Sequence, residues 1–236
     1  MSQFREPGSE NPFTFMLDEA FTGLLRSLMI CLPGRIVGFD PATQRAQVEC
    51  GVQRLVNGQR GITIPVIENV PVQFAGDSEW YHFHQITPGQ TEGLIHFTQR
   101  AADVWINQGG PSAPTDFRLF DAKDAFFSPG YRSGPRAIPG FPNDGAGISN
   151  YAGDVRIHAQ DGVITLEAGG ASIVIDGSGV TIDGAQITNN GNTTINGNIG
   201  VTGTMQNDGT NVGRTHTHPQ APDSAGDSQQ NTGTPQ

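Results

Sequence analysis

Two histidines stand one residue apart near the C-terminus, His216 and His218, in the stretch GTNVGRTHTHPQ. In an extended strand, side chains two residues apart point to the same side, with their backbones about 6.5–7 Å apart. Both imidazoles can then bind one metal ion. Two nitrogen ligands from one chain are too few for a closed site, so this interpretation requires further ligands. A His-x-His motif is weak by itself, and its meaning depends on the element that carries it.

The other histidines have ordinary structural interpretations. His82 and His84 repeat the same spacing in EWYHFHQIT, amid aromatic residues that predict a barrel strand. We expect these two to make ordinary hydrogen bonds on one strand face and to bind no metal. His96 and His158 occur singly. Because His158 alternates with Ile157 along the chain, we expect its side chain to face solvent.

The segment before the histidine pair, residues 151–213, is a repetitive array. Glycine, asparagine and threonine dominate it, and Arg156 is its one basic residue against six acidic ones. Within each of its recurring apolar pairs, the spacing of two places both side chains on one strand face. Repeats of this length are typical of a β-helix or β-prism. The repeated apolar positions are Val155/Ile157, Ile164/Leu166, Ile173/Ile175, Val180/Ile182, Ile187, Ile195 and Ile199/Val201.

One chain winding alone with so few apolar residues would bury little surface. Three chains wound around a shared axis would bring three copies of each pair to the centre and leave no open sheet edge. A single-chain solenoid and a disordered Gly/Asn linker are the alternatives, although regular Ile and Val positions weigh against disorder. A threefold axis would also collect six imidazoles, an octahedral set that suits Fe(II), Co(II) or Ni(II). A closed zinc site takes four ligands, which this symmetry does not supply.

Two different patterns precede the array. Residues 12–32 show apolar residues at three- and four-residue steps, which predict a helix capped by Asn11 and ended by Pro33-Gly34. This helix either docks on its own domain or bundles with copies of itself. Residues 34–133 contain short β-branched or aromatic runs separated by turn signals, which predict a small OB-type barrel. The runs are RIVGF, AQVEC, QRLV, ITIPVI, VPVQF, WYHFH, GLIHF and FRLF.

The chain is therefore predicted to be all-β, with one N-terminal helix and five parts in sequence order. These are an N-terminal helical segment (1–33), an OB-fold barrel (34–133), a Pro/Gly-rich linker (134–150), an intertwined trimeric β-helix shaft (151–213) and an apex with the His-x-His metal site (214–236).

The composition excludes several classes of protein. The 236 residues carry a net charge of −10 and a single lysine, Lys123, which argues against nucleic-acid binding because phosphates need clustered Lys and Arg. The only cysteines, Cys31 and Cys50, are expected to be buried free thiols, since two cysteines make neither a disulfide framework nor a zinc cluster. We expect no secretory signal and no membrane-spanning segment.

The order of parts resembles the central spike proteins of contractile-tailed phages, the baseplate assembly protein V type of Mu-like and related myophages. The barrel stretches VPVQF (70–74), EGLIHFTQRAADVWINQGG (92–110) and FDAKDAFFSPGYRS (120–133) resemble that family's barrel motifs, and THTHPQ and NTGTPQ resemble its apex. The resemblance covers nearly the whole chain. It implies an OB-fold, a trimeric β-helix and one iron ion per trimer, held by His216 and His218 of three chains.

The resemblance also implies a mechanical function. The barrel end would attach to tail hub or baseplate proteins, and the apex, at the distal tip of the tail baseplate in the virion, would pierce the host outer membrane. Some relatives carry a cell-wall-hydrolysing domain between barrel and β-helix, but the seventeen residues 134–150 are too few for one. No catalytic residues are expected. A receptor-binding tail fibre and a β-helix polysaccharide-degrading enzyme are the alternatives; the sequence has no nucleophile elbow and no phosphate loop to favour an enzyme.

Overall fold

The computed structural model describes residues 11–56, 60–184, 186–222, 224–227 and 230–233. The chain forms two compact units, Met1–Phe141 and Pro142–Gln236, and each is described by itself. No helix in the described part of the chain is long and apolar enough to cross a membrane. Residues 1–10 of the predicted helical segment, and 234–236 of the predicted apex, lie outside the described residues.

Helix α1 (Pro12–Ser27) begins as predicted. Asn11 caps it by accepting a hydrogen bond from the Phe13 N–H at 3.1 Å, and Pro12 occupies the first turn, where its missing N–H would have no partner in any case. The predicted end at Pro33-Gly34 is wrong. The helix stops at Ser27, because strand β1 already begins at Cys31 and uses both residues in a sheet.

The apolar stripe of α1 is not buried within its own unit. Phe13, Leu17 and Phe21 are all exposed, although they recur at four-residue steps on one side of the helix. Of the two predicted interpretations, docking on the chain's own domain is therefore not observed among the described residues.

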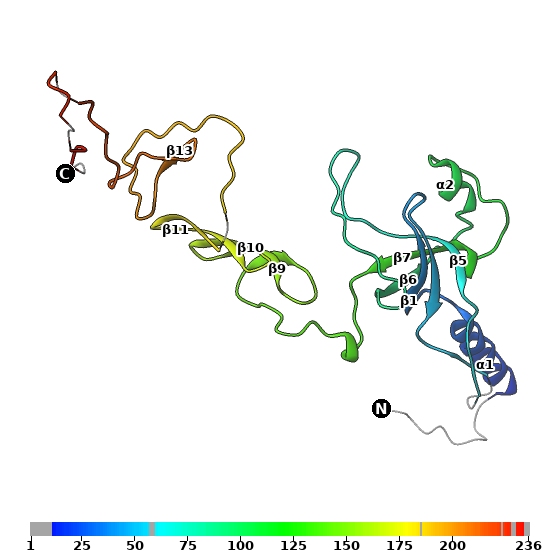
Figure 1. The fold of residues 1–236 in the computed structure, drawn as a ribbon. Helices are drawn as coiled ribbons and strands as arrows, with labels where there is room; N and C mark the ends of the chain where they lie inside the picture. The colour runs from blue at the N-terminus through cyan, green and yellow to red at the C-terminus, as the bar shows by residue number, and fades with distance from the viewer. Residues whose placement is uncertain (1–10, 57–59, 185, 223, 228–229, 234–236) are drawn as a thin grey trace. The chain divides into compact units, whose positions relative to one another are not determined.

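The first unit is built on a curled five-stranded antiparallel sheet with the order β5-β2-β1-β6-β7 (Figure 1). Its edges approach each other where Val72 bridges Phe127 and the Gln73 N–H donates to the Phe127 carbonyl at 2.9 Å. The result is an OB-like half-barrel. The strands are β1 (Cys31–Asp40), β2 (Arg45–Cys50), β5 (Ile67–Pro71), β6 (Glu92–Phe97) and β7 (Ala125–Pro129), with a separate hairpin of β3 (Arg54–Val56) and β4 (Arg60–Ile62).

The barrel core comes from residues that alternate along these strands. In β2 and β6 every second residue is buried, which is the pattern of strands with one face in a core. Four large apolar side chains are wholly buried, one from each of β1, β2, β6 and β7: Ile36, Val48, Ile95 and Phe127. Burying each stabilises the fold by about 1.5–3 kcal/mol relative to exposure.

Three strand predictions in the barrel are wrong. The runs WYHFH (80–84) and FRLF (117–120) are loops, and β7 at AFFSP was missed. Aromatic residues predict strands because they usually fill a sheet face, but Phe83 and Phe117 are almost fully exposed. Helix α2 (Asp103–Gln108) lies in the β6–β7 connection, and short 3-10 turns occupy Ala122–Asp124 and Gly134–Arg136.

The cysteines are both free, but they differ in burial. Cys50 is buried at the end of β2, as predicted, and burial raises the pKa of its thiol. Cys31 is exposed, contrary to the prediction, because it begins β1 at the rim of the barrel beside His96 of β6.

The second unit contains a five-stranded antiparallel meander with the order β12-β11-β10-β9-β8. Two-residue turns join strands β9 to β12, and residues 150–154 join β8 to β9. The turn at Gly169-Gly170 has positive φ at both positions, as tight hairpins require. The strands are β8 (Ala146–Ser149), β9 (Val155–Gln160), β10 (Val163–Ala168), β11 (Ala171–Asp176) and β12 (Gly179–Asp183). β8 lies inside the segment predicted as a linker. The apolar pairs from Val155/Ile157 to Val180/Ile182 lie in strands as predicted, whereas Ile187, Ile195 and Ile199/Val201 lie in irregular chain. Among the described residues these strands form a meander, and no β-helical winding is seen.

Beyond this sheet the chain is mostly irregular. A short hairpin of β13 (Gln206–Asn207) and β14 (Thr210–Asn211) immediately precedes the histidine pair. The hairpin leads into the turn at residues 214–215, directly before the two histidines.

Candidate functional site

The candidate metal ligands His216 and His218 lie against each other. Their ring centroids are 5.1 Å apart, and the rings are perpendicular. His216 is half-buried and His218 is exposed. The two residues are in irregular chain after a turn rather than in a strand, but the rings still gather on one side.

Hydrogen bonding leaves one nitrogen of His216 available for a metal. Its Nδ1 lies 2.6 Å from the Gly213 carbonyl oxygen. A carbonyl only accepts, so Nδ1 carries the proton, and in the neutral ring Nε2 then carries the lone pair. Metal-binding histidines are commonly oriented by this kind of bond to a backbone carbonyl. The ring of His216 is therefore held in a form that can bind a cation.

Neighbouring contacts fix the turn that carries the pair. Asn211, at the end of β14, accepts the Gly213 N–H at 2.9 Å and donates to the Thr215 hydroxyl at 2.8 Å. On the other side, His218 exchanges two hydrogen bonds with Thr232, at 2.9 and 3.0 Å. The tail thus folds back onto the histidine pair. Within the described residues of one chain, no third His, Cys, Asp or Glu joins a metal-binding cluster.

The comparison pair His82 and His84 occupies a different setting. Both are exposed and lie in a loop rather than in the predicted barrel strand. The His84 ring stands 5.2 Å from the ring of Phe74, so it has an ordinary packing contact. His96 lies beside Cys31, with Nδ1 and Sγ 3.8 Å apart.

The prediction for His158 is wrong, because this side chain is only 8% exposed. Strand β8 pairs with β9 and places Gly147 opposite His158. A Cβ at Gly145 would lie 3.0 Å from His158 Nε2, so the absence of a side chain there lets this segment cover the imidazole. Asp144 Oδ1 approaches the same nitrogen at 3.3 Å, without hydrogen-bond alignment.

The meander presents an apolar face that is exposed among the described residues of its unit. The pairing register aligns Ile148, Ile157, Leu166, Ile173 and Ile182 in one row across all five strands. A second row contains Ile164, Ile175 and Val180. All eight of these side chains are exposed. We call this surface the shaft face.

The opposite face of the same sheet is polar and yet better covered. It carries the Arg156–Glu167 ion pair at 2.6 Å and the buried His158. In β10, Thr165 and Glu167 are half-buried whereas Ile164 and Leu166 are exposed. A contiguous exposed apolar face of this kind is typical of an interaction surface.

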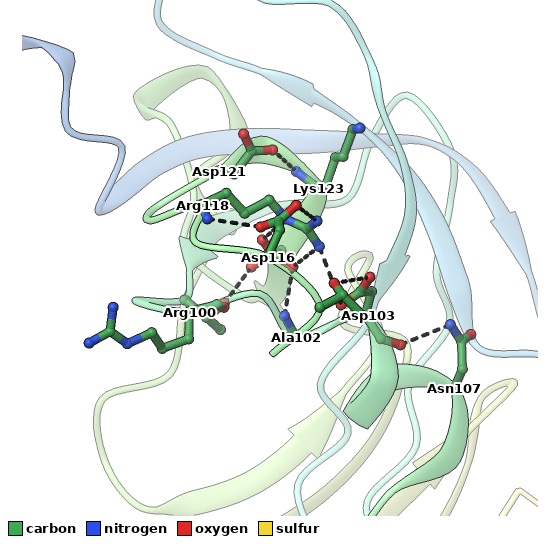
Figure 2. Close-up of polar contacts among 11 residues, drawn as sticks. Arg100, Ala102, Asp103, Asn107, Asp116, Arg118, Asp121 and Lys123 are labelled. Carbon is green, nitrogen blue, oxygen red and sulfur yellow. Dashed lines mark hydrogen bonds and ion pairs between the residues drawn. The ribbon is translucent and has the colours of Figure 1, made fainter. Parts of the chain in front are cut away.

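A buried charge cluster, which the sequence analysis missed, organises the β6–β7 connection. Asp124 is completely buried and accepts two hydrogen bonds from Arg118, at 2.6 and 3.0 Å, and one from the Ala102 N–H at 2.7 Å. Arg118 also pairs with Asp116 at 2.8 Å and Asp103 at 3.4 Å (Figure 2). Asp124 is visible in the stretch FDAKDAFFSPG, but the sequence does not show that Arg118 is its partner, because the fold decides that pairing.

This cluster attaches α2 to the barrel, because Asp103 is the first residue of that helix. Thr115 donates to both carboxylate oxygens of Asp103, at 3.0 and 2.9 Å, which ties down the long loop after α2. The barrel therefore carries an ordered connection in which buried and exposed charged pairs help to fix the position of a helix.

Residues 32–130 match the family model of the phage protein Gp138 N-terminal domain. The match covers the half-barrel, α2 and the charge cluster, and it spans less than half of the chain. A comparison with curated proteins found no match. The Gp138-like domain supports a phage tail or baseplate protein, with a structural function and a place in the virion.

Acid should destabilise the Gp138-like domain through its charge cluster. Hydrogen bonds from Thr115 and the charge of Arg118 lower the pKa of Asp103, and the N–H and guanidinium of Arg118 lower the pKa of Asp116. A lowered folded-state pKa adds stability above the unfolded value, and this stability is lost as pH falls through the folded value. The melting temperature should be constant from neutral pH to about pH 5 and should fall below roughly pH 4.

The control is the pair of substitutions Asp103→Asn and Asp116→Asn. This variant should be less stable at neutral pH and should lose part of the decline in acid, because two of the titrating groups are gone. An unchanged acid profile in this variant would assign the decline to other carboxylates.

Proposed function

We propose that the protein is the central spike of a contractile phage tail, a homotrimer that pierces the host outer membrane mechanically at the distal tip of the baseplate. The observation that carries the proposal is the uncovered shaft face, on a chain whose barrel matches a phage domain. The work of piercing would come from sheath contraction, so no catalytic group is required of this chain.

Copies of the same chain are the best cover for the shaft face. Its rows consist of isoleucine, leucine and valine, which interdigitate well between sheets. Around a threefold axis each copy would contribute the same rows, and the apolar face of every sheet would turn inward. The polar face, already stabilised by the Arg156–Glu167 pair, would then form the outer wall of a rigid shaft.

The histidine pair fits the tip of such a shaft. Two imidazoles per chain are incomplete alone, and three chains would supply six nitrogens to one ion on the axis. His216 already holds its Nδ1 proton against Gly213, which leaves Nε2 for the metal. When bound, iron would tie together three chain ends that otherwise fray. Binding only to the assembled trimer stabilises it by linkage.

The N-terminal end is the proposed attachment to the tail hub or baseplate. It carries the Gp138-like barrel and the exposed stripe of α1. The barrel has no role in nucleic-acid binding in this proposal. The alternative functions are a receptor-binding tail fibre and, less favoured, a polysaccharide-degrading enzyme. Arg156, the basic residue of the array, is ion-paired with Glu167 and therefore poorly placed to stabilise a sugar anion.

The test is native mass spectrometry of the full chain with metal analysis. We expect a mass of three times 25.1 kDa and one iron per three chains. A monodisperse single chain at micromolar concentration would contradict the trimer. A trimer without bound metal would favour the tail fibre.

Replacing His216 and His218 by alanine should remove the metal and leave the trimer intact. The barrel and shaft have their own interfaces, so the effect should be confined to the tip. Limited proteolysis should then cut beyond Val212, where the parent protein is protected. The matched control is His82→Ala with His84→Ala, which should retain its metal. Metal loss from the control would mean that His82 and His84 contribute to the site. Full protection of the tip in the first variant would mean that the metal does not hold the tip together.

A further inference from the structure

The β5–β6 connection carries a turn whose backbone is fixed by one carboxylate. Asp77 Oδ1 accepts the N–H groups of Glu79 and Trp80, both at 2.8 Å, and its own N–H donates to the Trp80 carbonyl at 2.8 Å. The two backbone N–H donors lower the pKa of Asp77, so it stays ionised. Gly76 bridges Tyr81 across the base of the turn. The turn is therefore preorganised.

This ordered turn presents aromatic side chains to water. Trp80 is 81% exposed, Tyr81 67% and Phe83 83%. In Figure 1 the connection, drawn in cyan, extends from the barrel on the side away from α2. Rigid, clustered aromatic residues lose little conformational entropy on docking and are the residues that dominate protein interfaces. We call residues 77–83 the aromatic turn.

A groove on the same unit matches this turn. It has a volume of about 600 Å³, within the range of ligand sites, and lies between α2 and strands β2, β5 and β7. Four aromatic residues stand among its lining residues, and two of them, Trp105 and Phe126, have their rings 5.8 Å apart. Arg45 lies in the wall, where its Nη2 donates to the Ile106 carbonyl at 2.9 Å.

The charges of the two surfaces are complementary. The aromatic turn carries the carboxylates of Asp77 and Glu79, and the groove carries the guanidinium of Arg45. Neither Glu79 nor Arg45 has an ion-pair partner among the residues that the structure describes. The turn is largely exposed within its own chain, so it does not occupy its own groove.

We propose that the aromatic turn of one copy docks into the α2 groove of the next copy, with Trp80 against Trp105 and Phe126 and with Glu79 facing Arg45. Turn and groove are different surfaces, so the contact is head-to-tail and repeats around an axis until it closes. The inference rests on the proposed threefold shaft. With three chains in the shaft, the closed ring would consist of three barrels. The ring would add contacts between the barrels, but it would not by itself hold three chains together at micromolar concentration.

Cross-linking of the full chain tests this contact. Ser78→Cys and Asn107→Cys place thiols on the turn and in the groove and leave Glu79 in place, with Cys31→Ser removing the exposed natural thiol. A short bismaleimide should then produce covalent three-chain products, which neither single cysteine variant should give. A three-chain native mass without such products would overturn the docking and leave the trimer intact. A single-chain native mass would overturn the trimer as well.

Hydrogen exchange supplies a second measurement on the uncross-linked trimer. Trp80→Ala should speed amide exchange in α2 about tenfold, because docking would no longer protect the helix, while the native mass stays at three chains. His82→Ala is the matched control and should leave α2 protection unchanged. Unchanged α2 exchange in the Trp80 variant, or protection that appears only when an oligosaccharide is added, would overturn the proposal.

Discussion

Replacing Leu166 with aspartate should leave the protein as single chains in solution. Leu166 lies at the centre of the shaft face, paired with Ile157 on one side and Ile173 on the other. It is 37% exposed in the single chain, so it is available to a partner without any rearrangement of the sheet. The substitution removes an apolar contact in each of three copies and adds three carboxylates near one axis.

The expected size of this effect combines lost burial with added charge. Fully burying a leucine contributes about 1.5–3 kcal/mol, and Leu166 has 37% of its surface left to bury, so three copies lose roughly 2–3 kcal/mol together. That lowers the association constant at least roughly tenfold, and the cost of bringing three carboxylates together in an apolar core adds to it. The native mass should fall from three chains to one at micromolar concentration.

The matched control is Thr181→Asp, which adds the same charge to the opposite face of the same sheet. Thr181 is exposed and lies across from Val174 of β11. This variant should remain trimeric, because the proposed interface does not include that face. If Leu166→Asp kept the three-chain mass, or if both variants dissociated equally, the shaft face would not be the interface.

The second large effect is expected in the barrel. Asp124→Asn should lower its melting temperature by roughly 10 °C, because breaking a buried ion pair is costly even though Arg118 keeps its pairs with Asp116 and Asp103. Asp124 is completely buried, and Arg118 reaches it with two hydrogen bonds. The amide keeps the size of the side chain, so packing is conserved and the change isolates the charge.

Asp116→Asn is the control for that substitution. Asp116 pairs with the same arginine, but its side chain is 51% exposed, and exposed pairs contribute little. Its melting temperature should fall by roughly 4 °C at most. Calorimetry of the two variants at neutral pH makes the comparison. Equal shifts would mean that burial of Asp124 adds nothing to the pair.

Local sequence determines the beginning of α1 and much of the half-barrel. An asparagine followed by proline can satisfy a helix N-terminus with atoms from adjacent residues, and the structure shows that cap. Alternation in β2 and β6 likewise predicts one buried face, because successive side chains point to opposite sides. These features need no knowledge of distant parts of the chain.

The errors occur where a distant contact decides. The aromatic run at 80–84 resembles a strand, but the carboxylate of Asp77 binds the turn backbone and competes with sheet pairing. Strand β7 was missed because it is defined by closure against Val72 and by pairing with β6, neither of which is visible in its own residues. His158 was expected in solvent because its neighbours in sequence do not show that the segment with Gly145 and Gly147 covers it.

The sequence by itself determined the capped helix, the alternating strands of an OB-like barrel and the spacing of apolar pairs and histidines along the second unit. These depend on backbone periodicity and on short-range hydrogen bonds. Only the tertiary structure decided that Arg118 is the partner of Asp124 and that the apolar pairs line up on one uncovered face. Pairing register and charge partners depend on which segments meet in space, and that choice is made by the cooperative packing of the whole fold.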